Sequence, residues 1–212
     1  MIAPPTRFRD LPDGGVEVVR ETRESIVTVR LEFGDRRETE IATGIVFFDH
    51  MLEMIGWHAE LNVEASYATK RFNLQHVVCE DVGIVLGGAV HHLVSARIGS
   101  GVASVGEGHG TIDEALAFAM FSLEGRANHH LDLPESQRRD PVEDVSGSDL
   151  VQFFEGFAQG SRGTVHLRLL SGTDPHHRWE ACFRAFARAL RGALAPAAWR
   201  AGMTAGVKGT LE

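Results

Sequence analysis

Two stretches of sequence decide the fold: HVVCED at His76–Asp81 and HHRWEA at His176–Ala181. Each opens a segment in which apolar residues recur at helical spacing, which predicts long helices over 76–96 and 176–194. The His and Glu residues of the two stretches are offset by 100 residues. A single repeat of that length indicates an internally duplicated protein rather than a solenoid.

Shorter elements precede each long helix. Apolar residues at helical spacing predict a helix over 47–57, and Asp149 can cap another that runs through Ala158. Asp174–Pro175 opens the last long helix, and Pro196 follows its end. Alternating apolar residues predict strands at 16–19, 26–31, 61–67 and 164–170.

Three segments show no clear helical period. Residues 99–110 are rich in glycine and are expected to form a loop or a weak strand, and 113–123 are strand-like at their end. Residues 134–147 contain few apolar side chains and predict a surface loop. We therefore predict an α+β fold of two half-domains, 1–110 and 111–212, that together form one compact domain. Each half-domain is expected to be a sheet of about four strands with two helices covering one face.

Composition narrows the function classes. The chain has 212 residues, 43% of them hydrophobic, which is ordinary for a folded domain. Its net charge of -8 argues against a nucleic-acid partner, although a few arginines or lysines can still bind one phosphate group. Cys79 and Cys182 lie in apolar segments and are expected to be free, buried thiols. Because the sequence has no run of about 18 apolar residues and no apolar core near its start, we expect a cytoplasmic protein without a membrane segment.

The spacing of His76 with Glu80, and of His176 with Glu180, points to metal binding. Residues four apart on a helix share one face, so an imidazole and a carboxylate can bind the same ion. This donor pair suits manganese, iron, zinc or nickel better than calcium or magnesium. One such pair is readily explained as an ion pair within a helix, but two in corresponding positions favour a metal site. His177 points about 100° around its helix, toward a different site.

The sequence resembles the imidazoleglycerol-phosphate dehydratase family from about Arg20 to Leu211. The resemblance rests on six ordered motifs: TGIVFFDHML (43–52), HVVCEDVGI (76–84), IDEAL (112–116), LEGR (123–126), HHRWEACFRAFARAL (176–190) and VKGTL (207–211). It implies a duplicated α+β fold, assembly through trimers into a 24-subunit homo-oligomer, and two manganese ions at each active site between subunits. The implied reaction removes water from imidazoleglycerol phosphate to give imidazole acetol phosphate in histidine biosynthesis. The metals would make the imidazole ring of this small phosphorylated substrate an electron sink.

The same resemblance assigns roles to individual residues. It makes Glu24, Glu80 and Glu180 catalytic, and it assigns Arg126, Lys208 and His58 to substrate binding, with the two cations on the phosphate. The implied metal ligands are His50, His76, Glu80, His176, His177 and Glu180.

The sequence also departs from the family pattern. Val77 replaces a second adjacent histidine, Gln152 replaces a histidine before Phe153–Phe154, and Ser104 replaces an arginine. Gly206 or Val207 stands where the family has a serine. Valine cannot bind a metal, and glutamine is a weak, neutral ligand. Three interpretations stay open: a single-metal enzyme, a divergent paralogue acting on another imidazole or phosphorylated compound, and a binding or structural protein that has lost catalysis.

Overall fold

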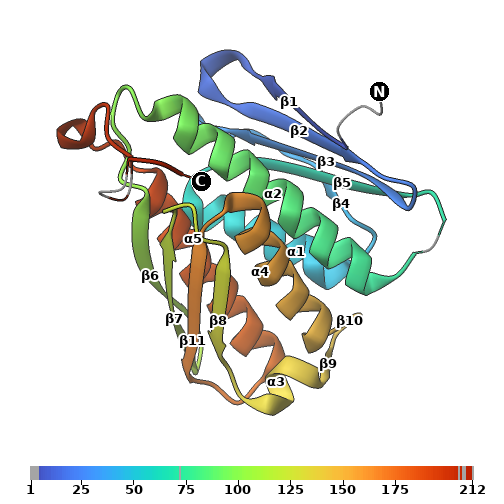
Figure 1. The fold of residues 1–212 in the computed structure, drawn as a ribbon. Helices are drawn as coiled ribbons and strands as arrows, with labels where there is room; N and C mark the ends of the chain where they lie inside the picture. Colours follow the sequence, from blue (N-terminus) through green and yellow to red (C-terminus); the bar gives the residue numbers. More distant parts are fainter. Residues whose placement is uncertain (1–4, 72, 205, 207–208, 212) are drawn as a thin grey trace.

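The protein has two larger β-sheets on the outside and its long helices between them, as Figure 1 shows. The computed structural model describes residues 5–71, 73–204, 206 and 209–211. Each sheet packs on two helices through one face and exposes the other. The fold is therefore the predicted α+β arrangement.

The first sheet is built from the N-terminal part of the chain. The alternation in sequence places Val27, Val29 and Leu31 on the buried face, because successive side chains of a strand point to opposite faces. The strands predicted at 16–19, 26–31 and 61–67 are confirmed, and two outer strands were not predicted. In spatial order the strands are β1 (Thr6–Asp10), β2 (Val16–Glu21), β3 (Ser25–Glu32), β5 (Asn62–Thr69) and β4 (Ile41–Ala42).

The second sheet contains the glycine-rich segment as a full strand. The expectation of a loop or weak strand over 99–110 is confirmed only in part, because from residue 105 onward the segment is a regular strand in which the glycines serve packing. A Cβ on Gly106 or Gly110 would lie 2.1 Å from a backbone oxygen of the last helix, so glycine lets that helix lie directly on the strand. In spatial order the strands are β6 (Val105–Ile112), β7 (Ala115–Ser122), β11 (Thr164–Ser171) and β8 (Asn128–Asp132).

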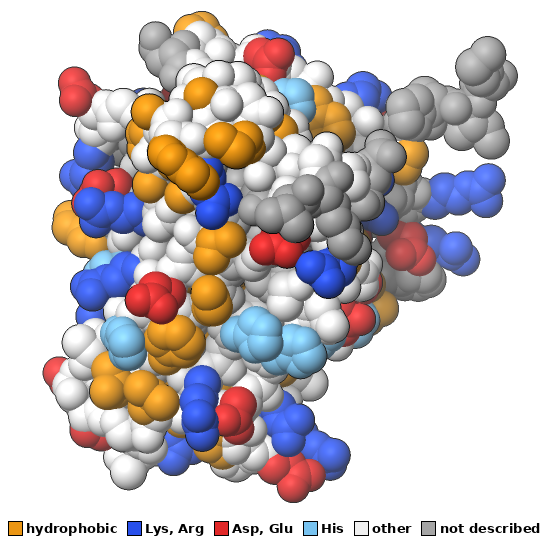
Figure 2. Space-filling view, turned by 60° about the vertical axis from the view of Figure 1, so that its left-hand side comes forward, with side chains coloured by type: hydrophobic (Ala, Val, Ile, Leu, Met, Phe, Trp, Pro, Cys, Tyr) orange, Lys and Arg blue, Asp and Glu red, His pale blue; other side chains and the backbone are white. Residues whose placement is uncertain are grey.

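The outer face of the second sheet comes forward in Figure 2 and is mixed in character. Histidines lie there beside hydrophobic and charged side chains. The rings of His130 and His166 stack with their centroids 4.6 Å apart, and His109 lies beside Phe118.

Four helices fill the space between the sheets: α1 (Val46–Ala59), α2 (Gln75–Arg97), α4 (Gly147–Ser161) and α5 (Pro175–Leu194). The predicted start of α5 is confirmed, and the Asp174 side chain caps it by accepting a hydrogen bond from the backbone of His177. The predicted cap of α4 was wrong by three residues. Ser146 is the N-cap and accepts from the backbone N–H of Asp149, which lies in the first turn.

The segment predicted as a surface loop over 134–147 contains short regular elements. They are α3 (Glu135–Arg139), β9 (Pro141–Val142) and β10 (Val145–Ser146). The prediction of a loop was wrong. Only a few side chains of the segment, among them Gln137, Val142 and Val145, are buried, so its composition resembled that of a surface loop. Such short elements carry no periodic pattern that a sequence can reveal.

The duplication is visible in the geometry. The helices α1 and α4 both end on a residue with positive φ, Glu60 and Arg162, which lie 102 residues apart, and the strands β5 and β11 share the same offset. The long helices α2 and α5 are offset by 100 residues. The short helix of each repeat packs on the long helix of the other: α1 contacts α5, and α4 contacts α2. Strand β6 spans the division predicted between residues 110 and 111, so separate half-domains stay a prediction.

The core is rich in phenylalanine. The Phe153 ring contacts the rings of Phe48, Phe157, Phe183 and others, which joins α1, α4 and α5. Within the described residues, α2 is the one helix whose length and composition would suit a membrane span. Its apolar window is 67% buried in the molecule, where packing on α4 and the first sheet accounts for that character.

Candidate metal centre

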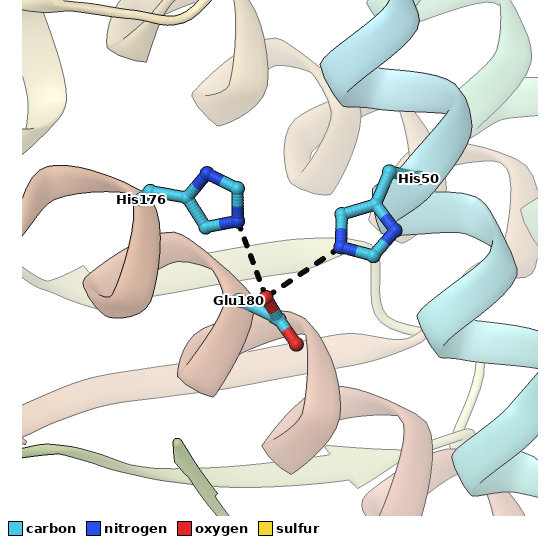
Figure 3. Close-up of side chains that lie close together, drawn as sticks. All are labelled: His50, His176 and Glu180. Carbon is cyan, nitrogen blue, oxygen red and sulfur yellow. Dashed lines mark ion pairs between the residues drawn. The ribbon is translucent and has the colours of Figure 1, made fainter. Parts of the chain in front are cut away.

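Three side chains converge between α1 and α5, as Figure 3 shows. His50 comes from α1, and His176 and Glu180 come from the first turns of α5. Oε2 of Glu180 lies 3.5 Å from Nε2 of His50 and 3.3 Å from Nε2 of His176. One donor atom from each residue lies within 4.8 Å of the others. Two imidazoles and a carboxylate at this separation can bind one divalent metal ion.

Glu180 is the buried member of the cluster, with 3% of its surface exposed. Burial raises the pKa of its carboxyl group, but the Arg184 guanidinium and His50 together lower it by more than burial raises it. The pKa of Glu180 therefore lies below the ordinary value. Arg184 donates to Oε1 of Glu180, while Oε2 faces the two histidines. The charged carboxylate is therefore present at neutral pH, and its Oε2 can bind a metal.

His176 is oriented by a residue that the sequence did not reveal. Its Nδ1 lies 3.0 Å from Oε1 of Glu143, in the turn between β9 and β10, which leaves Nε2 directed toward Glu180. A carboxylate on the second ring nitrogen of a ligating histidine fixes the orientation of the ring. Glu143 is 33 residues from His176 in sequence and has no motif around it, so no pattern indicated this contact.

The next residue of that turn holds the start of α1. Ile45 offers no side-chain cap, and the Asp144 carboxylate accepts instead from the backbone N–H groups of Val46 (2.7 Å) and Phe47 (2.9 Å). A carboxylate at a helix N-terminus satisfies free N–H groups and favours the helix dipole. Asp144 thus holds the beginning of α1, and Glu143 orients a side chain in the first turn of α5.

His177, a predicted metal ligand, lies outside this cluster. Its Nδ1 lies 2.9 Å from Glu114, which also accepts from the backbone of Thr173 and Asp174. These backbone hydrogen bonds and His177 hold the pKa of Glu114 well below its usual range, and Glu114 in turn raises the pKa of His177.

His76 and Glu80 form a separate pair at the start of α2, with Nε2 and Oε2 3.5 Å apart. Their side chains are 54% and 34% exposed. Across the part of the chain that the structure describes, His50, His176 and Glu180 form the one group of three such ligands, so the pair on α2 has no third partner of this kind.

The remaining predicted site residues lie at several places. His58 is two turns after His50 on α1 and lines a hollow together with Arg188 of α5. Burial and then the charges of Arg184 and Arg188 lower its pKa. Glu24 is exposed in the turn before β3, beside Ser25, whose hydroxyl donates to Asp81 of α2. Arg126 is exposed and pairs with Glu124 at 3.0 Å. Lys208 and Val207 lie outside the described residues.

A hollow of about 360 Å³ opens beside His176. It is lined by the turn between β9 and β10 and by the start of α5, including Glu143, Asp174 and His177. Nitrogen and carboxylate ligands of this kind fit manganese, iron or zinc. The duplicated α+β fold and this His/Glu cluster define a protein with a candidate metal centre between its two repeats.

Comparison with known proteins identifies the family. The family model described as "Imidazoleglycerol-phosphate dehydratase" matches residues 43–190. The dehydratase of Albidiferax ferrireducens is 35% identical over 202 residues, covering 95% of this chain and 97% of that one. The dehydratase of Burkholderia orbicola is 34% identical over 195 residues, covering 92% and 98%. The chain belongs to the imidazoleglycerol-phosphate dehydratase family.

Solved structures of relatives agree with this assignment. The crystal structure of the Pyrococcus furiosus dehydratase matches with a TM-score of 0.75 at 27% identity, covering 90% of this chain and 98% of that one. The Staphylococcus aureus dehydratase matches with a TM-score of 0.70 at 26% identity, covering 81% and 95%. The duplicated fold predicted from the sequence is thus the fold of this family.

Proposed function

We propose that this protein is a metal-dependent hydro-lyase that converts imidazoleglycerol phosphate to imidazole acetol phosphate in histidine biosynthesis. The observation that carries the proposal is the convergence of His50, His176 and Glu180 in a chain whose relatives bear the name of that dehydratase. The metal that these residues would hold is manganese. When bound, it supplies Lewis-acid chemistry, which stabilises negative charge on a ligand.

The chain's own residues hold the metal and move the proton. His50, His176 and Glu180 hold the metal, with Glu143 orienting His176 through Nδ1. His76, Glu80 and His177 are the further ligands that the family pattern assigns. Glu24, Glu80 and Glu180 are the candidate catalytic carboxylates, one of which would accept the substrate proton as general base.

The substrate phosphate needs cationic partners. We assign Arg126 and Lys208 to it, and His58 to the substrate near α5. The exposed guanidinium of Arg126 is suited to this role, because its geometry allows bidentate contact with a phosphate group. As homo-oligomers of the family are built from trimers, we further propose a trimer-based assembly of up to 24 subunits, located in the cytoplasm.

One observation favours a second function. Gln152 and Val77 offer no imidazole, and Ser104 offers no cation, at positions where the family has one. A divergent paralogue with one metal, acting on another imidazole or phosphorylated compound, would tolerate these losses, as would a binding or structural homologue. Glu24, Glu80, Glu180 and Arg126 favour the dehydratase, because a protein without catalysis has no evident need of them.

An assay of the purified protein tests the proposal. We expect formation of imidazole acetol phosphate from imidazoleglycerol phosphate with added Mn²⁺, and loss of this activity in His50→Ala and Glu180→Gln. The matched control is His109→Ala, which removes an exposed histidine from β6. Absence of product with the metal bound would overturn the dehydratase in favour of the second function.

A further inference from the structure

The duplication pairs each residue of α1 with a residue of α4. The positive-φ residues that end these helices, Glu60 and Arg162, are 102 residues apart, and so are the following strands β5 and β11. At the same offset, the buried residues Met51 and Leu52 correspond to Phe153 and Phe154, which are also buried. His50 corresponds to Gln152.

The long helices correspond at an offset of 100 residues, so His176 and Glu180 match His76 and Glu80. The cluster of His50, His176 and Glu180 therefore has a counterpart made of Gln152, His76 and Glu80. The first trio lies between α1 and α5, and the second lies between α4 and α2.

The backbone contacts of α4 and α2 place the second trio together. A Cβ on Gly156 would lie 2.4 Å from the Glu80 carbonyl oxygen, and one on Gly160 would lie 2.0 Å from that of Ile84. The two helices therefore run side by side in the same direction. Gln152, one turn before Gly156, lies beside the turn of α2 that carries His76 and Glu80.

The two trios differ most at one position, because Gln152 stands where the first trio has His50. A glutamine side chain is neutral, and its amide oxygen is a far weaker ligand than imidazole nitrogen for manganese or zinc. The carboxylates differ too, since the Glu180 side chain is 5% exposed and the Glu80 side chain is 34% exposed. Ile84 stands where Arg184 supports Glu180 in the other repeat, so Glu80 lacks that partner as well.

We propose that the chain carries one strong metal site, at His50, His176 and Glu180, and one vestigial site, at His76 and Glu80, which lost its third donor at Gln152. The inference rests on the metal site of the proposed function. It assigns to Gln152 the role of setting the metal stoichiometry of each chain.

Titration of the metal-free protein with Mn²⁺ tests the inference, with bound metal counted by elemental analysis. We expect one tightly bound ion per chain, which His50→Ala removes and His76→Ala leaves in place. Gln152→His should create a second tight site. Because even groups one step removed from a metal alter affinity by about 10- to 100-fold, the added ligand should tighten the second ion at least about tenfold.

Two further variants keep the result interpretable. Gln152→Glu is nearly isosteric, so it preserves packing while adding a charged oxygen donor, and it should also tighten the second ion. Gln159→His places a new histidine on the exposed part of α4, two turns further along, and should add no second tight ion.

The outcomes separate this inference from the proposed function. One tight ion without dehydratase activity supports the asymmetry and overturns the activity. Two outcomes overturn only the proposed difference between the two sites. One is two tightly bound ions in the unaltered protein, and the other is no tighter binding of a second ion in either folded variant, Gln152→His or Gln152→Glu. No bound metal in the unaltered protein overturns both.

Discussion

At the scale of single residues, Glu143 decides how His176 is presented. Its carboxylate lies 3.0 Å from Nδ1, and the opposite ring nitrogen faces Glu180. Because Glu143 is itself 57% exposed, its contribution to stability is small, and its effect falls on the orientation of the imidazole ring.

We expect Glu143→Gln to weaken binding of Mn²⁺ by roughly 10-fold, because glutamine keeps an acceptor oxygen for Nδ1 but lacks the carboxylate charge that supports a ligating histidine. The free energy of unfolding of the metal-free protein should stay nearly unchanged. Calorimetric titration and chemical denaturation measure the two quantities. Glu135→Gln, which alters an exposed ion pair on α3, is the control. Unaltered affinity in Glu143→Gln would show that His176 needs no such partner.

At the scale of elements, close contact between α5 and β6 depends on glycine. Gly110 has an ordinary negative-φ conformation, but a Cβ there would lie 2.1 Å from the carbonyl oxygen of Ala181. This oxygen belongs to the backbone of a helix and cannot move alone.

We expect Gly110→Ala to destabilise the protein by about 3 kcal/mol, at the upper end of the cost of overpacking a core. Gly99→Ala is the control, because no atom of the described residues lies within 4 Å of a Cβ at that position. Denaturant unfolding measures both. Equal stability of the two variants would show that α5 can shift away from β6.

The exposed face of the first sheet carries a row of alternating charge. Arg9, Glu17, Arg30 and Glu64 lie opposite one another across β1, β2, β3 and β5. Glu64 also pairs with Arg37, with 2.6 Å between Oε1 and Nη1. The hydrogen bond from Arg37, with help from Arg30, lowers the pKa of Glu64.

A carboxyl group with a lowered pKa stabilises the folded state above its ordinary pKa of about 4.3, and this contribution is lost as the pH falls through the folded-state value. We expect Glu64→Gln to lower the free energy of unfolding by about 1 kcal/mol at pH 7. This difference in stability from the unaltered protein should disappear as the pH is lowered below 4. Unfolding measured across this range tests the sign. Glu60→Gln, in a pair that is more than half exposed, should show little difference at any pH. If the difference in stability between Glu64→Gln and the unaltered protein grew in acid, the lowered pKa of Glu64 would be contradicted.

At the scale of the whole molecule, the candidate metal cluster joins the two repeats. His50 comes from the first repeat, and His176 and Glu180 come from the second. An ion bound there would stabilise the folded chain, because its three donors come together only when α1 and α5 are packed together.

We expect Mn²⁺ at 100 times its dissociation constant to raise the free energy of unfolding by about 2.7 kcal/mol over the metal-stripped protein. His50→Ala should abolish this increase, and His109→Ala should retain it. Thermal unfolding with and without a chelator measures the effect. Equal stabilisation of both variants would place the bound metal elsewhere.

The sequence by itself determined the long helices, several of the sheet strands and their duplication. The periodicity after His76 and His176 placed the long helices, and alternation placed β3 and β11, because these patterns follow from local geometry along one segment. It also determined the spacing of His176 with Glu180, since residues four apart on a helix must share a face.

Only the tertiary structure decided which ligands meet. His50 joins His176 because α1 of one repeat packs on α5 of the other, while His177 and His76 lie apart from that cluster. Glu143, Asp144 and the regular strand over the full length of β6 were not identified for the same reason. Their roles depend on contacts with segments far away in the chain, where the packing of backbone and side chains, rather than local pattern, fixes position.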